Sequence, residues 1–229
     1  MSTPQLPLAL RAPADRIFDT FVGHPVPVGL LRALARGTSH DGAFVCGPQA
    51  SGKSHLLLAC VDDAARAGRR AAYVALAAAR GRLRDLLAAQ EGGDLVALDG
   101  VDAVAGERDD EVALFDFHNR ARASGCALVY AARAAPAQLA LVLPDLRSRL
   151  AQCTQLPLEV PDDALRRDVL RARAAWRGLA FDDAAFDFLL RRVDRDLVSL
   201  IDMLERLDRA SLAAQRRITV PFLREVLAL

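Results

Sequence analysis

The sequence lacks any uninterrupted apolar run of the roughly 20 residues that a helix needs to cross a bilayer. The segment Met1–Leu10 also lacks a basic stretch followed by a long apolar one, the arrangement typical of a secretory signal. Apolar residues nevertheless make up 52% of the 229 residues and charged residues 26%, which is the composition of a globular protein with a sizeable core. We therefore expect a soluble, cytoplasmic protein without a membrane segment.

Cysteine and net charge are scarce as well. The four cysteines, Cys46, Cys60, Cys126 and Cys153, lie far apart in apolar surroundings and form no Cys-x-x-Cys pair. This favours buried, reduced thiols over a zinc site or a disulfide framework. The formal net charge is only +1, so the chain lacks the basic field that non-specific duplex binding uses. Direct, sequence-specific DNA binding is not expected.

Short apolar runs alternate with amphipathic stretches over the first two thirds of the chain. Strands are expected at 43–46, 71–75, 95–98, 127–131 and 155–160. Helices are expected between them at 28–36, 53–67, 80–89 and 110–123. Continuous apolar strands separated by helices form parallel sheets that are covered on both faces, so the pattern predicts an α/β fold with a five-stranded parallel sheet.

After Val160 the apolar residues recur at helical spacing and no strand is expected. Asp162 is a candidate N-cap, Gly178 a candidate C-cap glycine, and Thr219 a candidate start of a last short helix. Three prolines precede the first helical period. We therefore divide the chain into a flexible arm at 1–15, an α/β domain at 16–160 and an α-helical domain at 161–229.

One motif carries specific chemistry. A Gly-x-x-x-x-Gly-Lys-Ser run follows an apolar strand and opens a helix, which is the context that a P-loop requires. The run consists of Gly47, Pro48, Gln49, Ala50, Ser51, Gly52, Lys53 and Ser54.

The residue types of this run suit phosphate and magnesium. The glycines let backbone amides approach phosphate oxygens, and the helix N-terminus adds the positive end of a dipole. Lys53 is expected to reach the β and γ phosphates, and Ser54 to coordinate Mg²⁺. The motif predicts a bound purine nucleoside diphosphate or triphosphate, ADP or ATP, together with Mg²⁺.

A second magnesium-side group is expected at the end of the third strand. The apolar run at 95–98 ends in Asp99, about 45 residues after the P-loop. A carboxylate there would be a second ligand on the magnesium side of the site. Alternatively, Asp99 is an ordinary cap or turn residue.

The order of these features resembles that of the DnaA-related AAA+ ATPases. The features are the P-loop, the strand ending in Asp99, the segment Asp145–Leu150, and a helical region that contains Asp194–Leu197. The likeness spans nearly the whole chain. It implies the P-loop AAA+ fold, with the α/β part as the nucleotide-binding domain and the helical part as its lid.

Within this family the likeness points to regulators that inactivate the initiator DnaA. It rests on the segment 5–10, on 207–211 together with 215–217, and on an end at Leu229 where an initiator would continue into a DNA-binding domain. The resemblance implies a negative regulator of DNA replication initiation. The alternative is an autonomous AAA+ ATPase that loads a helicase or remodels a partner.

Three site assignments follow from the resemblance. It implies that Arg149 is an arginine finger, which acts in trans on the nucleotide of a neighbouring AAA+ subunit; the alternative is a surface arginine at a helix end. It implies that Arg195 is the sensor-2 arginine of the lid, the alternative being a solvated helix face. Phe21 and Val22 correspond to the segment beside adenine, although Phe18 and Phe21 could also belong to the core.

Two departures from the family pattern weaken hydrolysis. Gly100 stands where the family carries the acid that positions the attacking water, and Asp102 is expected to face another direction. The fourth strand ends in Tyr130, two alanines and Arg133, which indicates no evident sensor of a γ phosphate. We expect slow intrinsic hydrolysis and a preference for a bound diphosphate.

The N-terminal arm resembles the short peptide with which bacterial proteins dock on the DNA polymerase III sliding clamp, the β subunit. Its glutamine suits the polar rim of a pocket and its leucines suit an apolar groove. The peptide consists of Gln5, Leu6, Pro7, Leu8, Ala9 and Leu10. Alternatively, the arm packs on its own domain. The expected partners are DnaA and the clamp on DNA, with a homo-oligomer as a further expectation.

Overall fold

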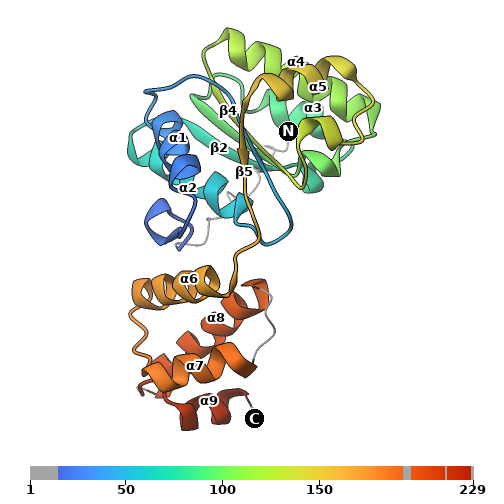
Figure 1. Ribbon diagram of the computed structural model, residues 1–229. Helices are drawn as coiled ribbons and strands as arrows, with labels where there is room; N and C mark the ends of the chain where they lie inside the picture. Colours follow the sequence, from blue (N-terminus) through green and yellow to red (C-terminus); the bar gives the residue numbers. More distant parts are fainter. Residues whose placement is uncertain (1–14, 193–196, 215, 228–229) are drawn as a thin grey trace, which may run out of the picture.

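The computed structural model describes residues 15–192, 197–214 and 216–227. They form a layered α/β part with a group of helices next to it (Figure 1). The α/β part consists of α1 Pro25–Ala35, β1 Ala43–Cys46, α2 Lys53–Arg66, β2 Ala71–Ala75, α3 Leu83–Ala88, β3 Leu95–Asp99, α4 Arg108–Ala123, β4 Ala127–Ala132, α5 Pro144–Gln152 and β5 Thr154–Pro157. Short 3-10 turns lie at η1 Phe18–Thr20, η2 Leu76–Ala79, η3 Val101–Ala103 and η4 Pro136–Gln138.

The five strands form one sheet in the order β2-β3-β4-β1-β5, and every neighbouring pair is parallel. Successive side chains of a strand point to opposite faces. Phe44 of β1 belongs to the buried cluster with α3, α4 and α5, whereas Val45 belongs to the cluster with α1 and α2. These two groups of helices lie on different sides of the sheet (Figure 1). Both faces are covered, which is why the strands read as continuous apolar runs. The predicted five-stranded parallel α/β fold is confirmed.

Three element boundaries were predicted wrongly. The last strand, expected at 155–160, is Thr154–Pro157, because Pro157 is the register partner of Cys46, the last residue of β1. The first helix begins three residues earlier than expected, at Pro25, since proline suits the first turn of a helix. Helix α3 begins later, at Leu83, because the Arg82 amide closes the preceding turn onto the Ala79 carbonyl.

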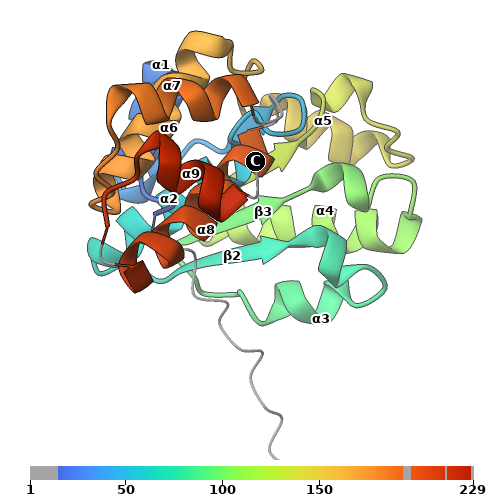
Figure 2. The same cartoon turned by 90° about the horizontal axis from the view of Figure 1, so that it is seen from below.

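The helical region has its own apolar core. This helical region consists of α6 Asp163–Trp176, α7 Asp183–Arg192, α8 Leu197–Ala214 and α9 Val220–Leu227. Its buried centre includes Leu170, Leu189, Leu204 and Phe222. Seen from below, these helices lie nearer to α1 and α2 than to α3 and α5 (Figure 2). The helices therefore cover one side of the α/β part.

The predicted starts of two helices in this region are confirmed. The Asp162 side chain accepts a hydrogen bond of 2.7 Å from the Leu165 amide and so caps α6. Helix α9 begins directly after Thr219. Within the ranges that the structure describes, no helix combines the length and apolar character that a membrane crossing requires. All four cysteines are buried and unpaired.

Candidate functional site

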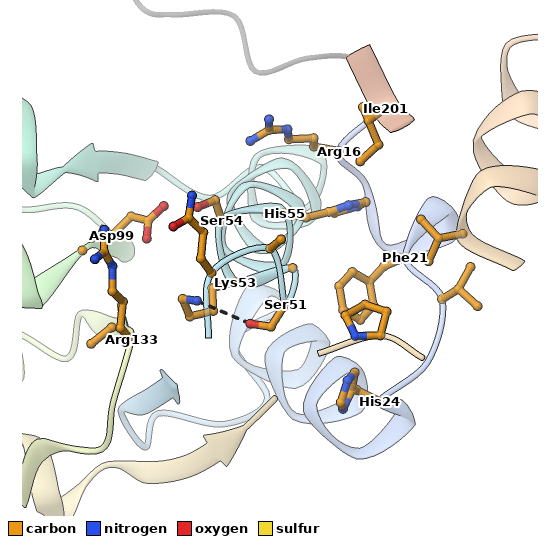
Figure 3. Close-up of a pocket in the computed structure, with 18 of the residues that line it drawn as sticks. Arg16, Phe21, His24, Ser51, Lys53, Ser54, His55, Asp99, Arg133 and Ile201 are labelled. Atoms are coloured by element: carbon orange, nitrogen blue, oxygen red, sulfur yellow. Dashed lines mark hydrogen bonds between the residues drawn. The ribbon is translucent and has the colours of Figure 1, made fainter. Parts of the chain in front are cut away.

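A cavity of about 480 Å³ lies between the sheet and the helical region, which is within the usual size range of ligand pockets. Its walls come from η1, the P-loop, the ends of β2, β3 and β4, and helices α6 and α8. Strands β3 and β4 contribute their C-terminal ends, where open parallel sheets bind ligands. The cavity has two different ends (Figure 3). Lys53, Asp99 and Arg133 lie at a polar end, and Phe21 and His24 lie at an aromatic end.

The P-loop backbone requires glycine at position 52. Gly52 has φ 95°, and a Cβ added there would lie 2.7 Å from a ring carbon of Phe21. Both the left-handed conformation and the close approach exclude larger residues. Gly52 is the N-cap of α2, so the free amides of that helix N-terminus open onto the cavity, as phosphate binding requires.

The Lys53 side chain folds back onto the P-loop residues that precede it. Its Nζ donates to the Gly47 carbonyl at 2.6 Å, to the Pro48 carbonyl at 2.5 Å and to Ser51 Oγ at 3.4 Å, the last drawn as a dashed line in Figure 3. Burial lowers the pKa of Lys53, and the nearby carboxylate of Asp99 opposes this shift. The ammonium group is thus held at the loop, while residues 49–54 line the cavity.

Asp99 is held by a residue that the sequence did not indicate. Tyr73 Oη on β2 donates a hydrogen bond of 2.6 Å to Asp99 Oδ2. Burial, with the Asp99 carboxylate adding to it, raises the pKa of Tyr73, so the phenol remains a donor. Ser54 lies on the same side of the cavity as Asp99 (Figure 3), and its side chain also interacts with the Tyr73 phenol. The hydroxyl and carboxylate oxygens fit a hard cation such as Mg²⁺, which prefers oxygen ligands and completes its shell with water or phosphate.

Near the aromatic end of the cavity, the two phenylalanines in and directly after η1 have different surroundings. Phe18 is buried in the core, whereas Phe21 and Val22 line the cavity. The Phe21 ring meets His55 edge-on at 5.2 Å between ring centroids, and lies 6.4 Å from His24. An apolar surface with an aromatic face, next to a phosphate loop, is suited to a flat heterocyclic base.

The structure brings Asp102 and Arg133 into the polar end of the cavity. Asp102, which was expected to face another direction than position 100, thus still lines the cavity. Gly100 has φ 84°, and this left-handed residue starts the η3 turn that carries Asp102 back toward β4. Arg133 is the first residue after β4, so it lies at the C-terminal edge of the sheet, a positional signal that could have identified it.

A buried ionic cluster joins the P-loop helix to the helical region. Arg173 of α6 donates from Nη1 to Asp15 Oδ2 at 2.7 Å, and its Nη2 lies 3.1 Å from His55 Nδ1. His55 Nε2 lies 2.9 Å from the Ile17 carbonyl. Since that carbonyl can only accept, Nε2 carries the proton and Nδ1 accepts from Arg173. Arg177 also donates to Asp15 Oδ2, at 2.9 Å.

Replacing Arg173 with alanine is expected to lower the free energy of unfolding by about 3 to 5 kcal/mol, because it leaves the buried Asp15 carboxylate without a main partner. The Arg173 and Asp15 side chains are only 6% and 3% exposed. Arg167→Ala on the same helix is the control, since its pair with Asp187 is about 40% exposed and is worth less than about 1 kcal/mol. Urea titrations compare the two variants. Equal losses would show that the cluster does not join the parts.

Stability is also expected to fall between pH 7 and pH 5 through His55. Burial lowers the pKa of His55 from 6.5 to about 4, with Arg173 adding to the shift. The unfolded chain therefore binds the proton more readily between pH 6.5 and 4, so acid favours unfolding by about 1 to 2 kcal/mol at pH 5. His55→Gln should remove this part of the loss in urea titrations, whereas His40→Gln, at an exposed position, should retain it. Burial also lowers the pKa of His118 to about 4, so a similar loss through His118 is expected in all three proteins. Identical pH slopes for all three proteins would contradict the assignment.

The remaining predicted residues lie elsewhere. Arg149 is exposed on α5 and is not among the residues that line the cavity. The neighbouring Arg147 is half-buried and donates from Nη2 to the Leu141 carbonyl. Arg195 and the arm residues 5–10 lie outside the described residues.

Comparison with known proteins yields two kinds of match. Residues 163–227 match the family model described as the lid domain of Hda. Domain III of the Thermotoga maritima replication initiation protein DnaA superposes with a TM-score of 0.77 at 20% identity, over 94% of this chain and 97% of that one. AMPPCP-bound DnaA from Aquifex aeolicus superposes with a TM-score of 0.67 at 20% identity, over 84% and 66%. The T. maritima RuvB branch migration motor gives 0.65 at 16% identity, over 93% and 71%.

The fold is that of AAA+ proteins. It combines a parallel sheet, a P-loop at the C-terminal end of β1, and a helical lid beside the sheet. The fold expected from the sequence is thus confirmed. The family match concerns the helical part alone: residues 163–227 are similar to the lid domain of Hda, and the fold as a whole is similar to that of DnaA domain III.

Proposed function

We propose that this protein is a nucleotide-bound regulator of DNA replication initiation that stimulates ATP hydrolysis by the initiator DnaA, as Hda, the regulatory inactivator of DnaA, does. Its lid matches the Hda lid family, and its fold is that of DnaA. The fold of this chain is thus similar to that of its proposed partner. The proposed setting is the cytoplasm.

The proposed ligand is ADP or ATP with Mg²⁺. Two similar DnaA structures are described as bound to AMPPCP, an ATP analogue. In this chain the amides before α2 and Lys53 would bind the phosphates, and Ser54 and Asp99 would hold the metal ion. Phe21 and Val22 would contact the base. Bound Mg²⁺ would neutralise phosphate charge at this end of the cavity.

The observation that carries the proposed activity is the position of Arg149. This arginine is exposed on α5, whereas the cavity of the same chain lies on the lid side of the sheet. Helix α5 is at the end of the molecule remote from α7 and α9 (Figure 1). A guanidinium is always charged and can donate to two phosphate oxygens at once, which suits the stabilisation of a phosphoryl-transfer transition state in a second molecule.

Intrinsic hydrolysis is proposed to be slow. Gly100 offers no carboxylate beside Asp99 to orient an attacking water. Asp102 lines the cavity, but one of its oxygens accepts from the Arg133 amide at 2.9 Å and the other lies 3.4 Å from Arg133 Nε. A carboxylate engaged on both oxygens is a poor base. Slow turnover is therefore expected, and we propose separately that the bound nucleotide is a diphosphate.

The second candidate function is an autonomous ATPase that loads a helicase or remodels a partner, and the cavity lined by a complete P-loop is what favours it. Steady-state turnover of the isolated protein, with Lys53→Ala as the background control, separates the two candidates. The regulator requires turnover far below 1 s⁻¹, whereas turnover on the order of 1 s⁻¹ or faster, within the ordinary enzymatic range, would support the autonomous ATPase.

The arm is proposed to bind the sliding clamp through Gln5 and Leu6. Changing both residues to alanine should abolish co-elution with the clamp and leave ADP affinity unchanged, because the arm precedes the folded part. Ser2→Ala with Thr3→Ala is the matched control and should still bind. Clamp binding by the Gln5/Leu6 variant would rule the peptide out, and a loss of ADP affinity would indicate a structural arm.

A further inference from the structure

We propose that the pair Asp102–Arg133 makes the cavity select a nucleoside diphosphate over a triphosphate. This inference rests on the proposed binding of an adenine nucleotide. It identifies the side chains that would distinguish a diphosphate from a triphosphate. Neither residue was assigned a role from the sequence.

Asp102 holds Arg133 at two points. Asp102 Oδ1 accepts a hydrogen bond of 2.9 Å from the Arg133 amide, and Asp102 Oδ2 lies 3.4 Å from Arg133 Nε. The two residues come from neighbouring segments, Asp102 from η3 after β3 and Arg133 from the end of β4. The Asp102 side chain is 26% exposed, so this carboxylate is more sheltered than its partner, which is 71% exposed.

The pair lies at the phosphate end of the cavity. Both residues line it together with Lys53, Ser54 and Asp99, and the close-up places Arg133 beside Asp99 and away from Phe21 and His24 (Figure 3). Both groups also act electrostatically on the Lys53 ammonium, Asp102 raising its pKa and Arg133 lowering it. Lys53 is the group that reaches the β and γ phosphates of a P-loop ligand.

The charges at this end explain the direction of the selection. The loop amides and Lys53 would bind the α and β phosphates. A bound diphosphate would therefore leave the ion pair between Asp102 and Arg133 unbroken. A γ phosphate would add negative charge next to two carboxylates, Asp99 and Asp102. To gain Arg133 as a ligand it would have to compete with Asp102, while the Asp102 charge repels it.

Two substitutions with opposite expected effects test this inference. Asp102→Asn keeps an oxygen that can accept from the Arg133 amide but removes the negative charge, so Arg133 becomes available to a γ phosphate. Arg133→Ala removes the cation and leaves the Asp102 charge unpaired at the cavity, without changing any backbone hydrogen bond. Asp116→Asn is the control, because it removes the carboxylate of a similarly exposed pair, Arg84–Asp116, outside the cavity.

Calorimetry of the full chain with Mg²⁺ would measure the dissociation constants of ADP and of AMPPCP, a triphosphate analogue. The ratio of the AMPPCP constant to the ADP constant should exceed 1 in the unmodified protein. It should fall about three- to tenfold in Asp102→Asn and rise by a similar factor in Arg133→Ala, the range set by one partly exposed charge pair. Asp116→Asn should leave it unchanged.

The possible failures are distinct. If the unmodified protein binds neither nucleotide, the proposed function fails and this inference fails with it. If it binds both but the ratio stays constant in Asp102→Asn and Arg133→Ala, or shifts equally in Asp116→Asn, the nucleotide site stands and the role of the pair is overturned. A fall of the ratio in both pocket variants would likewise overturn it, because Arg133 would then not favour the γ phosphate.

Discussion

Lys53→Ala is expected to abolish the binding of ADP and ATP. Its ammonium group lies at the P-loop, bonded to the Gly47 and Pro48 carbonyls, and it is the loop's one cation for the β and γ phosphates. Calorimetry should show no saturable binding at nucleotide concentrations up to about 1 mM, a concentration at which even weak sites are occupied. Unchanged affinity for both nucleotides would refute the P-loop assignment.

Lys53→Arg provides a sharper control than alanine. Lys53 is the only lysine in a sequence whose other side-chain cations, histidine apart, are all arginine. A planar guanidinium cannot replace a compact ammonium that donates to two carbonyls of one tight loop. We therefore expect Lys53→Arg to lose most of its nucleotide affinity although the net charge is unchanged. Full affinity in this variant would mean that charge alone, and not loop geometry, matters at this position.

Arg149→Ala is expected to eliminate the stimulation of DnaA by this protein. Arginine fingers supplied in trans contribute about 10³ to 10⁵ in rate where they have been measured in GTPases. Because Arg149 lies outside the cavity of its own chain, the variant should bind ADP and the clamp normally. Arg149→Lys should restore little activity, since an ammonium lacks the fork that spans two phosphate oxygens.

Two other arginines serve as controls for Arg149. Arg147 is two positions away, about 200° around the helix, and its side chain is engaged with the Leu141 carbonyl. Arg108 is exposed at the start of α4 and reports on the loss of a surface charge alone. Both alanine variants should retain stimulation. If Arg147→Ala abolished it while Arg149→Ala did not, the finger would be Arg147.

Local sequence signals predicted the features that depend on neighbouring residues. The apolar runs defined the parallel strands, and Asp162 and Thr219 marked helix starts that the structure contains. The P-loop was recognisable because its function requires a fixed spacing along a strand, a turn and a helix. The end of β5 was predicted wrongly, since it depends on where its neighbour β1 ends and not on its own composition.

Contacts between distant segments could not be predicted in this way. The Arg173–Asp15 pair joins residues 158 positions apart, and the Arg173–His55 contact spans 118 positions. The pairing of Asp102 with Arg133 depends on the direction of the η3 turn, which Gly100 sets through its positive φ. Only the position of Arg133 at the end of a buried strand hinted at a place in the site.

The proposed function depends most on one activity, the stimulation of ATP hydrolysis in a second AAA+ protein. The direct measurement is the rate at which DnaA loaded with radiolabelled ATP converts it to ADP. This protein, the sliding clamp and DNA are each omitted in turn, and Arg149→Ala replaces the unmodified protein in a parallel series. We predict rapid conversion only when all three components and Arg149 are present. Equal rates with and without this protein, or full stimulation by Arg149→Ala, would contradict the account.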